Sequence, residues 1–328
     1  MKAEEWKTRI LTTSDIKSVW NMKKSLQAVE DALRFIGEGD LFQEKCQYLI
    51  PSEGNFSFLL PHPAYIRPWK VVGDKWLGCC DGNPPKGLPY TVGVTTINDA
   101  DTMMPIAFMD AAYLTGMRTA AMAAMGAKYL ARKDSQVLTI IGCGVQGETH
   151  VSAMCDLEIF PFKKVQIYDV REEAMQSLKK YIEENYGLEA VPMSSVADAV
   201  KGGDIVCSVT TCRTALIFDN MLVPGTHLVP TCLWDIDIKN ILHNADKWVL
   251  GNTQSDNWLQ RPAAMVDADK VYTDLSEIVC GRKPGRENAQ ERTVMTHLGM
   301  GANDVAIAYQ AYKAAIEAGV GFDVQIMS

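Results

Sequence analysis

The chain has 328 residues, of which 47% are hydrophobic and 22% are charged, and its Asp and Glu residues outnumber Lys and Arg by 40 to 32. This composition excludes a disordered chain and a collagen-like repeat, and the length suits two domains or one large one. The formal net charge of −8 argues against a nucleic-acid partner, because proteins that bind phosphate backbones normally carry a basic surface.

The sequence favours neither membrane insertion nor export, and its cysteines and histidines lack the spacing of metal motifs. No apolar run reaches the ~18 residues that span a membrane, and the charged start from Met1 to Trp6 lacks the apolar core of a signal peptide. The nine cysteines form no C-x-x-C pair and the five histidines form no H-x-x-x-H pair. We therefore expect a cytoplasmic protein with reduced cysteines, no membrane partner and no metal site.

The first third of the chain combines a helix with several short strands. Thr12–Asp15 offers helix caps, and apolar residues continue at helical spacing as far as Ile36, just before Gly37 and Gly39. Extended runs separated by turn residues follow at Cys46–Ile50, Phe56–Leu60, Lys75–Cys80, Tyr90–Asn98 and Ile106–Met109. Such closely spaced runs predict an antiparallel sheet or a barrel-like domain.

After this region, one long helix precedes a regular alternation of strands and helices. The helix is predicted over Asp110–Arg132, and its many small residues indicate close packing. Strands are predicted at Val137–Ile141, Lys164–Val170, Leu188–Pro192, Asp204–Thr210, Thr226–Thr231, Lys247–Leu250 and Val294–Leu298. Helical or loop segments are expected between them, and a last helix ends at Gly319. This alternation predicts a doubly wound parallel sheet.

A glycine motif directly follows the strand Val137–Ile141 and opens a helix. In the G-x-G-x-x-G pattern, the glycines allow a tight turn, close approach of the backbone to a pyrophosphate, and packing of the helix on the strand. The helix N-terminus then presents N–H groups to the phosphates. The residues predicted to bind the cofactor in this loop are Gly142, Gly144, Val145, Gln146 and Gly147.

An acidic residue ends the second strand of this unit. Asp169 stands where a carboxylate binds the ribose hydroxyls of a dinucleotide and repels a 2′-phosphate, which favours NAD over NADP. Val170 and Arg171 follow it, and Arg171 would meet a 2′-phosphate if Asp169 turned away, so NADP stays the alternative. Thr210 and Thr211 are expected to line the same groove. The competing interpretation is a glycine turn and a surface aspartate in a nucleotide-free domain.

Several motifs together resemble the ornithine cyclodeaminase/μ-crystallin family, nearly end to end. They are Gly87–Pro89, Met109–Ala121, Ile141–Gly147, Asp274–Arg286 and Leu298–Asp304. The resemblance implies an α/β protein in which a Rossmann-type doubly wound parallel sheet (residues 120–301) is inserted into an α+β substrate-binding and dimerisation domain. Residues 1–119 and 302–328 form that second domain, and the implied assembly is a homodimer.

The resemblance also implies the chemistry. Family members exchange a hydride between NAD and the α-carbon of an amino acid or a (cyclic) imino acid, as amino-acid dehydrogenases or ketimine reductases do. One alternative is a cyclodeaminase-type lyase that eliminates ammonia and recycles its NAD internally. A second alternative is a non-catalytic protein that binds NAD(P)H.

Two cations are the first candidates for catalysis and substrate binding. Strand alternation places Lys75 on the same face as Leu77 and Cys79, and the resemblance assigns it carboxylate binding and proton transfer at the amine. The competing interpretation is a snorkelling lysine on an edge strand. Arg118 needs an anion because a buried unpaired charge is costly. The resemblance makes that anion the substrate carboxylate, whereas an ion pair with Asp110 is the alternative.

A catalytic aspartate and a third cation are less well placed. By resemblance, Asp235 or Asp237 activates water or ammonia, and the alternative for each is to cap the helix Ile238–Leu242. Lys45 falls near a substrate-binding arginine of the family. A lysine keeps the charge there but lacks the bidentate fork, so ornithine cyclodeamination itself is not expected.

Three further residues, Asp304, His62 and His297, complete the set of site candidates. Asp304 is expected to cap the last helix close to the nicotinamide and so to contribute to cofactor binding. His62 and His297 are expected to be hydrogen-bonded core or pocket histidines rather than catalytic acids.

Overall fold

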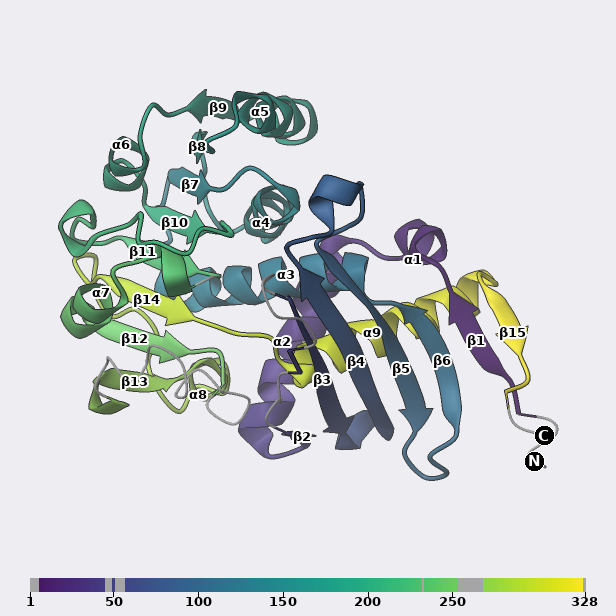
Figure 1. Ribbon diagram of the computed structural model, residues 1–328. Helices are drawn as coiled ribbons and strands as arrows, with labels where there is room; N and C mark the ends of the chain where they lie inside the picture. Colours follow the sequence, from purple (N-terminus) through teal and green to yellow (C-terminus); the bar gives the residue numbers. More distant parts are fainter. Residues whose placement is uncertain (1–5, 45–48, 51–56, 232, 253–267, 327–328) are drawn as a thin grey trace. The chain divides into compact units, whose positions relative to one another are not determined.

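The computed structural model describes residues 6–44, 49–50, 57–231, 233–252 and 268–326 (Figure 1). These residues form two compact units. The first unit contains the residues up to Arg118 and from Gly299 onward, and the second contains those from Thr119 to Leu298. The chain passes from the first to the second within helix α3 (Ala112–Leu130).

The first unit is built on a seven-stranded sheet in the order β15-β1-β6-β5-β4-β3-β2. The strands are β1 (Thr8–Leu11), β2 (Leu41–Gln43), β3 (Ser57–Ile66), β4 (Val71–Cys80), β5 (Thr91–Asp99), β6 (Pro105–Asp110) and β15 (Phe322–Val324). Its neighbouring strands pair antiparallel except for β1 and β6, which are parallel. The antiparallel prediction is therefore largely confirmed, whereas β15 and β2 lie at the two edges of an open sheet and do not close a barrel within the described strands.

Helices cover one face of this sheet. They are α1 (Thr13–Val19), α2 (Met22–Glu38) and α9 (Gly301–Ala318), with short 3-10 turns η2 (Arg67–Trp69) and η3 (Pro84–Lys86). Thr12 and Asp15 form a capping box at the start of α1, and Gly39 ends α2 in the left-handed conformation at φ +77°. Helix α9 packs on β3, β4 and β5, and α2 packs on α9. The predicted strand Cys46–Ile50 falls mostly outside the described residues; Leu49 forms an isolated bridge with Leu59.

Alternation along β4 separates a buried face from an exposed one. Lys75 and Leu77 are buried on the face covered by α9, and a Cβ atom at Gly73 on this face would lie 3.0 Å from Val305 of α9. Trp76 points to the opposite face and is 39% exposed. The predicted orientation of Lys75 relative to Leu77 is confirmed.

The second unit contains an eight-stranded sheet in the order β13-β12-β14-β11-β10-β7-β8-β9. The strands are β7 (Val137–Ile141), β8 (Lys164–Tyr168), β9 (Glu189–Pro192), β10 (Ile205–Ser208), β11 (His227–Pro230), β12 (Lys247–Leu250), β13 (Val271–Asp274) and β14 (Thr293–Thr296). The neighbouring strands pair in parallel.

Helices lie on both faces of this second sheet, with α4 and α5 on one side and α6 and α7 on the other (Figure 1). The helical segments after α3 are α4 (Val145–Asp156), α5 (Glu172–Tyr186), α6 (Val196–Lys201), α7 (Ile238–Asn244), α8 (Leu275–Val279), and the 3-10 turns η4 (Asp219–Met221), η5 (Leu233–Asp235) and η8 (Ala268–Lys270). This arrangement confirms the doubly wound prediction. From β7 the chain runs to β8 and β9 on one side and returns to β10 on the other, so the topological switch point lies between β7 and β10.

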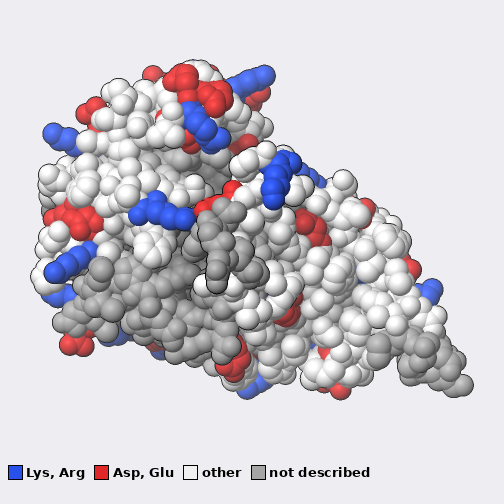
Figure 2. Space-filling view, viewed as in Figure 1, with Lys and Arg blue, Asp and Glu red and all other residues white. Residues whose placement is uncertain are grey.

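The surface carries charges of both signs. Over the face shown in Figure 2, Lys and Arg side chains are interspersed with Asp and Glu. Within the described part of the chain, no helix is both long and apolar enough to cross a membrane.

The second unit buries a neutral histidine in its sheet. His227 at the start of β11 is 0% exposed, and its Nδ1 atom lies 2.9 Å from the Thr293 hydroxyl of β14. Burial, with a smaller contribution from the charge of Arg286, lowers the pKa of His227 from 6.5 to about 3. Below pH 6.5, His227 therefore binds a proton in the unfolded chain but not in the folded chain. The folded state loses stability as the pH decreases from 6.5 toward 3.

Between pH 7 and pH 5, the unfolding free energy should fall by about 2 kcal/mol less in the His227→Gln variant than in the unaltered protein. The reason is that the variant lacks the group that binds a proton on unfolding. Urea unfolding followed by the fluorescence of tryptophan, including the buried Trp248 of β12, measures this difference. The control is His243→Gln, which alters an exposed histidine of α7. An unchanged pH dependence in His227→Gln would contradict the assignment.

Candidate active site

A buried cluster of charged side chains lies in the first unit, centred on Asp304. One carboxylate oxygen of Asp304 lies 2.7 Å from Lys75 Nζ and 2.7 Å from His62 Nδ1, and the other accepts a hydrogen bond of 2.9 Å from Arg118 Nε. Each of the four side chains is at most 7% exposed. We refer to these four residues as the Asp304 cluster.

Four elements bring the Asp304 cluster together. His62 of β3 and Lys75 of β4 are register partners, so their side chains leave the sheet side by side on the same face. Arg118 comes from α3, and Asp304 lies in the first turn of α9. Gly299, just before α9, lets the chain approach β3 closely, because a Cβ atom there would lie 2.2 Å from the imidazole of His62.

The electrostatics of the cluster leave one positive charge in excess. Burial acts to raise the pKa of Asp304, but the Lys75 and Arg118 cations outweigh burial and hold that pKa well below its usual range. Burial and the charge of Lys75 lower the pKa of His62 to about 4, so its imidazole is neutral at neutral pH. Among these four side chains, two cations and one anion carry a formal charge of +1, which favours the binding of a small anion such as a carboxylate. The neighbouring Asp74 carboxylate, which accepts a hydrogen bond of 2.7 Å from the His62 N–H, also acts on the charge of Lys75.

The structure settles several alternatives about these residues. Strand β4 lies between β3 and β5, so Lys75 is not on an edge strand. Asp110 accepts hydrogen bonds from Ala112 and Tyr113 N–H at the start of α3, and the partner of Arg118 is Asp304 instead.

The expected helix-capping role of Asp304 is wrong. The N-cap of α9 is Met300, which makes no side-chain cap bond, and the Asp304 carboxylate is directed to the cations. A contact between Asp304 and the nicotinamide stays a prediction. Lys45 lies outside the described residues. His62 is a buried, hydrogen-bonded histidine as expected, but its link to the cluster was missed.

The glycine motif forms a loop at the carboxyl end of β7 in the second unit. Gly142 adopts φ +104°, and a Cβ atom there would lie 3.0 Å from the Val209 carbonyl oxygen. A Cβ atom at Gly147 would lie 2.4 Å from the Gly142 carbonyl oxygen, so α4 packs directly against the loop. No atom comes within 4 Å of a Cβ placed at Gly144. Gly144 is the N-cap of α4 and adds no side-chain cap to its N–H groups, so the loop fits a pyrophosphate.

The residues after β8 adjoin this loop. Asp169 accepts hydrogen bonds from the backbone N–H of Cys143 at 2.8 Å and of Arg171 at 2.9 Å, and Arg171 Nε lies 3.3 Å from its carboxylate. Burial would raise the pKa of Asp169, but these hydrogen bonds outweigh it and the pKa is lowered. Its side chain is 10% exposed, unlike the surface aspartate of the competing interpretation, whereas Val170 and Arg171 are exposed. A ribose contact by Asp169 stays a prediction.

A second carboxylate is buried near the end of β10. Asp235 accepts hydrogen bonds from Ser208 Oγ at 2.7 Å and Thr210 Oγ1 at 2.8 Å. Burial raises the pKa of Asp235 above its ordinary value, although both hydroxyls oppose the rise. The N-cap of α7 is Asp237, so the capping alternative is wrong for Asp235. Thr211 is exposed beside Thr210.

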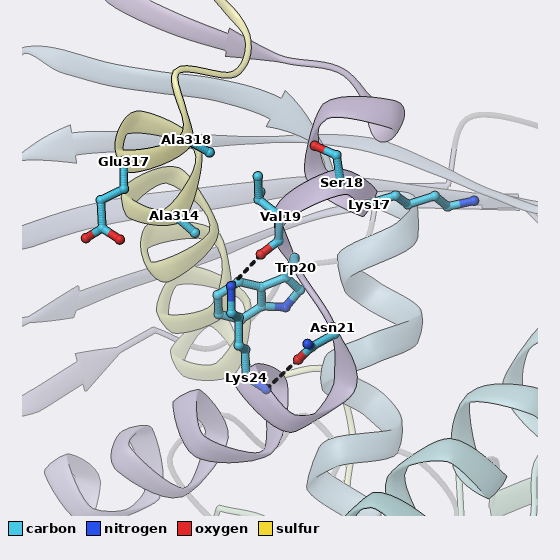
Figure 3. Close-up of a pocket in the computed structure, with 9 residues that line it drawn as sticks. All are labelled: Lys17, Ser18, Val19, Trp20, Asn21, Lys24, Ala314, Glu317 and Ala318. Carbon is cyan, nitrogen blue, oxygen red and sulfur yellow. Dashed lines mark hydrogen bonds between the residues drawn. The ribbon is translucent and has the colours of Figure 1, made fainter. Parts of the chain in front are cut away.

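A surface hollow and the potential metal ligands of the described residues offer no second candidate for an active site. A hollow of about 550 Å³ lies between the α1–α2 turn and the end of α9 (Figure 3). There Lys24 Nζ donates to the Val19 carbonyl at 2.6 Å and Asn21 Oδ1 accepts from the Lys24 N–H, bonds that shape the turn itself. Within the described ranges, no group of three or more His, Cys, Asp and Glu side chains is arranged to hold a metal ion.

Comparison with known proteins gives full-length similarities. The sequence matches the ornithine cyclodeaminase/mu-crystallin family over residues 6–319. It is 30% identical over 327 residues to the alanine dehydrogenase of Archaeoglobus fulgidus, covering 97% of this chain and 98% of that protein.

Two solved structures are similar over almost their whole length. The Δ1-pyrroline-2-carboxylate reductase of Thermococcus litoralis, in complex with NADH and L-proline, has a TM-score of 0.90 and 28% identity, covering 97% of this chain and 100% of that one. An archaeal alanine dehydrogenase dimer with bound NAD has a TM-score of 0.89 and 29% identity, covering 98% and 100%.

Replacement of Asp304 by Asn should destabilise the protein by about 3–5 kcal/mol, because Lys75 and Arg118 then keep buried charges without their anion. Urea unfolding at pH 7 measures the loss. The matched control is Asp101→Asn, which breaks the exposed ion pair with Lys70 and should leave the unfolding free energy nearly unchanged. Equal effects of the two substitutions would contradict the central role of Asp304.

Proposed function

The chain belongs to the ornithine cyclodeaminase/mu-crystallin family, and on this premise we propose that Arg118 and Lys75 bind the carboxylate of a substrate whose α-carbon exchanges a hydride with NAD. The protein is an NAD-dependent oxidoreductase that acts on amino or imino acids. The observation that supports the assigned site is the surplus of one positive charge in the buried Asp304 cluster. The carboxylate of a bound substrate would pair with this surplus.

The relatives support a small monocarboxylate. Alanine, in the name of the Archaeoglobus enzyme, and L-proline, bound to the Thermococcus enzyme, each carry a single carboxylate next to the reacting carbon. A guanidinium binds a carboxylate through two parallel hydrogen bonds and so fixes its orientation as well as its position. With the carboxylate fixed, the α-carbon and its nitrogen are also fixed, which is the contribution of positioning to catalysis.

Lys75 is the proton donor that the cluster offers. When bound, NAD accepts or supplies the hydride; in the reducing direction, a proton must reach the imine nitrogen as the hydride reaches the carbon. Arg118 cannot give up a proton at ordinary pH, and neutral His62 faces the Asp304 carboxylate with Nδ1. Lys75 Nζ therefore protonates the nitrogen directly or through a water, and the reverse transfer serves oxidation.

The second unit supplies the groups for the cofactor. Residues Gly142–Gly147 would hold the pyrophosphate, and Asp169 would accept hydrogen bonds from the ribose hydroxyls and repel a 2′-phosphate. We therefore assign cofactor binding to the predicted domain of residues 120–301 and substrate binding to residues 1–119 with 302–328. A cytoplasmic location is in keeping with the seven described cysteines, which are all free.

We expect the protein to oxidise NADH when the substrate is a cyclic imino acid, or an α-keto acid together with ammonia or an amine. The decrease in the absorbance of NADH measures the rate. Arg118→Lys should raise the substrate KM roughly tenfold while leaving the KM for NADH unchanged, because the lost fork touches only the carboxylate. Lys75→Ala should lower kcat roughly 10²- to 10⁴-fold. Lys70→Ala, at an exposed lysine before β4, is the control.

The other outcomes each identify a different error. Full activity in Lys75→Ala and Arg118→Lys would overturn the site, and a strong preference for NADPH would overturn the role of Asp169. Ornithine turnover with NAD⁺ and no net NADH would indicate the cyclodeaminase alternative. Tight NADH binding without turnover of any substrate in the panel would indicate a non-catalytic binding protein.

We also propose that the protein forms a homodimer through the face of the first sheet opposite α9. Strand register places exposed apolar side chains on this one face, among them Phe42, Trp76, Val92, Phe108 and Phe322. Exposed apolar patches of this kind mark interfaces, and a twofold axis lets one such face bind its own copy. A second copy is the favoured occupant because the similar alanine dehydrogenase is a dimer.

Trp76→Glu should convert the dimer to a monomer, because it would bury a charge at the centre of an apolar interface. Size-exclusion chromatography with light scattering measures the mass, and circular dichroism confirms that the variant is folded. The control Phe218→Glu changes an exposed aromatic residue of the second unit and should leave a dimer. A dimer that persists in folded Trp76→Glu would exclude this face.

A further inference from the structure

The second unit buries a carboxylate for which the proposed reaction has no use. Asp235 is 0% exposed, and one of its oxygens, Oδ2, accepts both the Ser208 and the Thr210 hydroxyl hydrogen bonds. The other oxygen, Oδ1, is buried and has no hydrogen-bond partner among the described residues. Burying a carboxylate is costly, so its retention calls for a physical reason.

The location of this carboxylate supplies that reason. In an open α/β sheet, ligands bind outside the carboxyl ends of the strands at the topological switch point, which here lies between β7 and β10. Gly142 follows β7, and Thr210 follows β10. A Cβ atom at Gly142 would lie 3.2 Å from Thr210 N, so the two loops are in close contact at this point.

The hydrogen bonds of Asp235 reach β10, the loop after β10 and the segment at Leu216 and Ile217. The Thr210 hydroxyl donates to Asp235 and accepts from the Cys212 N–H at 3.1 Å, so one side chain orders the loop from both sides. The Asp235 backbone is itself anchored, because its carbonyl accepts from the N–H groups of Leu216 at 2.9 Å and Ile217 at 3.1 Å. The anchored carboxylate is therefore a rigidly held hydrogen-bond acceptor for the Thr210 hydroxyl.

We propose that Asp235 is a positioning residue for the NAD site: its carboxylate fixes Thr210 and thereby holds the loop after β10 against the glycine loop. This role rests on the proposed function and replaces the direct catalytic role predicted for Asp235, because its bonded oxygen is occupied by two hydroxyls and its side chain has no access to solvent. Thr210 is then the residue through which Asp235 affects the cofactor.

Two hydroxyl deletions separate this role from a merely structural one. Thr210→Val and Ser208→Ala each remove one hydrogen bond to the same oxygen, but Ser208 lies within β10 and Thr210 lies in the loop. We expect Thr210→Val to raise the Kd for NADH, measured by fluorescence titration, roughly tenfold, the scale of one lost hydrogen bond to a charged group. Ser208→Ala should lower the melting temperature with little change in that Kd.

A double-mutant cycle tests whether Asp235 acts through Thr210. Asp235→Ala should raise the Kd for NADH by about the same factor as Thr210→Val, and the double variant should show no further loss. Asp235→Asn, which can still present one oxygen to both hydroxyls, should recover most of the affinity. The control Asp198→Asn alters an exposed aspartate of α6.

The outcomes distinguish this inference from the proposed function. Absence of NADH binding by the unaltered chain would overturn the proposed function itself. Normal NADH binding by the chain and by folded Thr210→Val would overturn the positioning role alone, as would equal Kd increases in Thr210→Val and Ser208→Ala. If Asp235→Ala does not fold, the comparison of the two hydroxyl deletions still decides the question.

Discussion

The carboxylate of Asp304 holds together side chains from β3, β4, α3 and α9, and the geometry of the first unit depends on it. A buried lysine and a buried arginine repel each other and lose hydration, so neither is tolerated without an anion. Asp304 satisfies both with one charge, which is half of what neutrality requires. A second acid would neutralise the cluster, and in the proposed function the substrate carboxylate brings that charge. Stability and binding are thus opposed at this site.

The second unit uses carboxylates differently. Asp169 accepts the backbone N–H of Cys143 in the glycine loop, and Asp235 accepts the hydroxyl of Thr210 in the loop after β10. Each acid fixes one of the two loops that flank the switch point. Loops fixed before the ligand arrives lose less conformational freedom on binding. In the first unit an acid orients cations, and in the second unit acids orient loops.

The sequence predicted the elements whose signals are local. The strand Val137–Ile141, the glycine turn after it and the inward face of Lys75 depend on neighbouring residues only, and the structure has them. The strands β1, β2, β13 and β15 were missed, because strands of three or four residues carry only a weak local signal and depend on pairing with a neighbouring strand. The Asp304 cluster was missed because His62 and Asp304 lie 242 positions apart, a distance over which periodicity carries no information.

The net negative charge of the whole chain is compatible with the local positive charge of the Asp304 cluster. A net charge of −8 repels anions at long range, but an α-amino acid also carries an ammonium group, so the field acts weakly on it. The local surplus of +1 then acts at hydrogen-bond distance, where a buried environment strengthens it. Phosphates require another solution, and the glycine loop offers backbone N–H groups and a helix N-terminus rather than cations. In the proposed function, cations fixed by Asp304 therefore recognise the substrate, while the backbone recognises the cofactor.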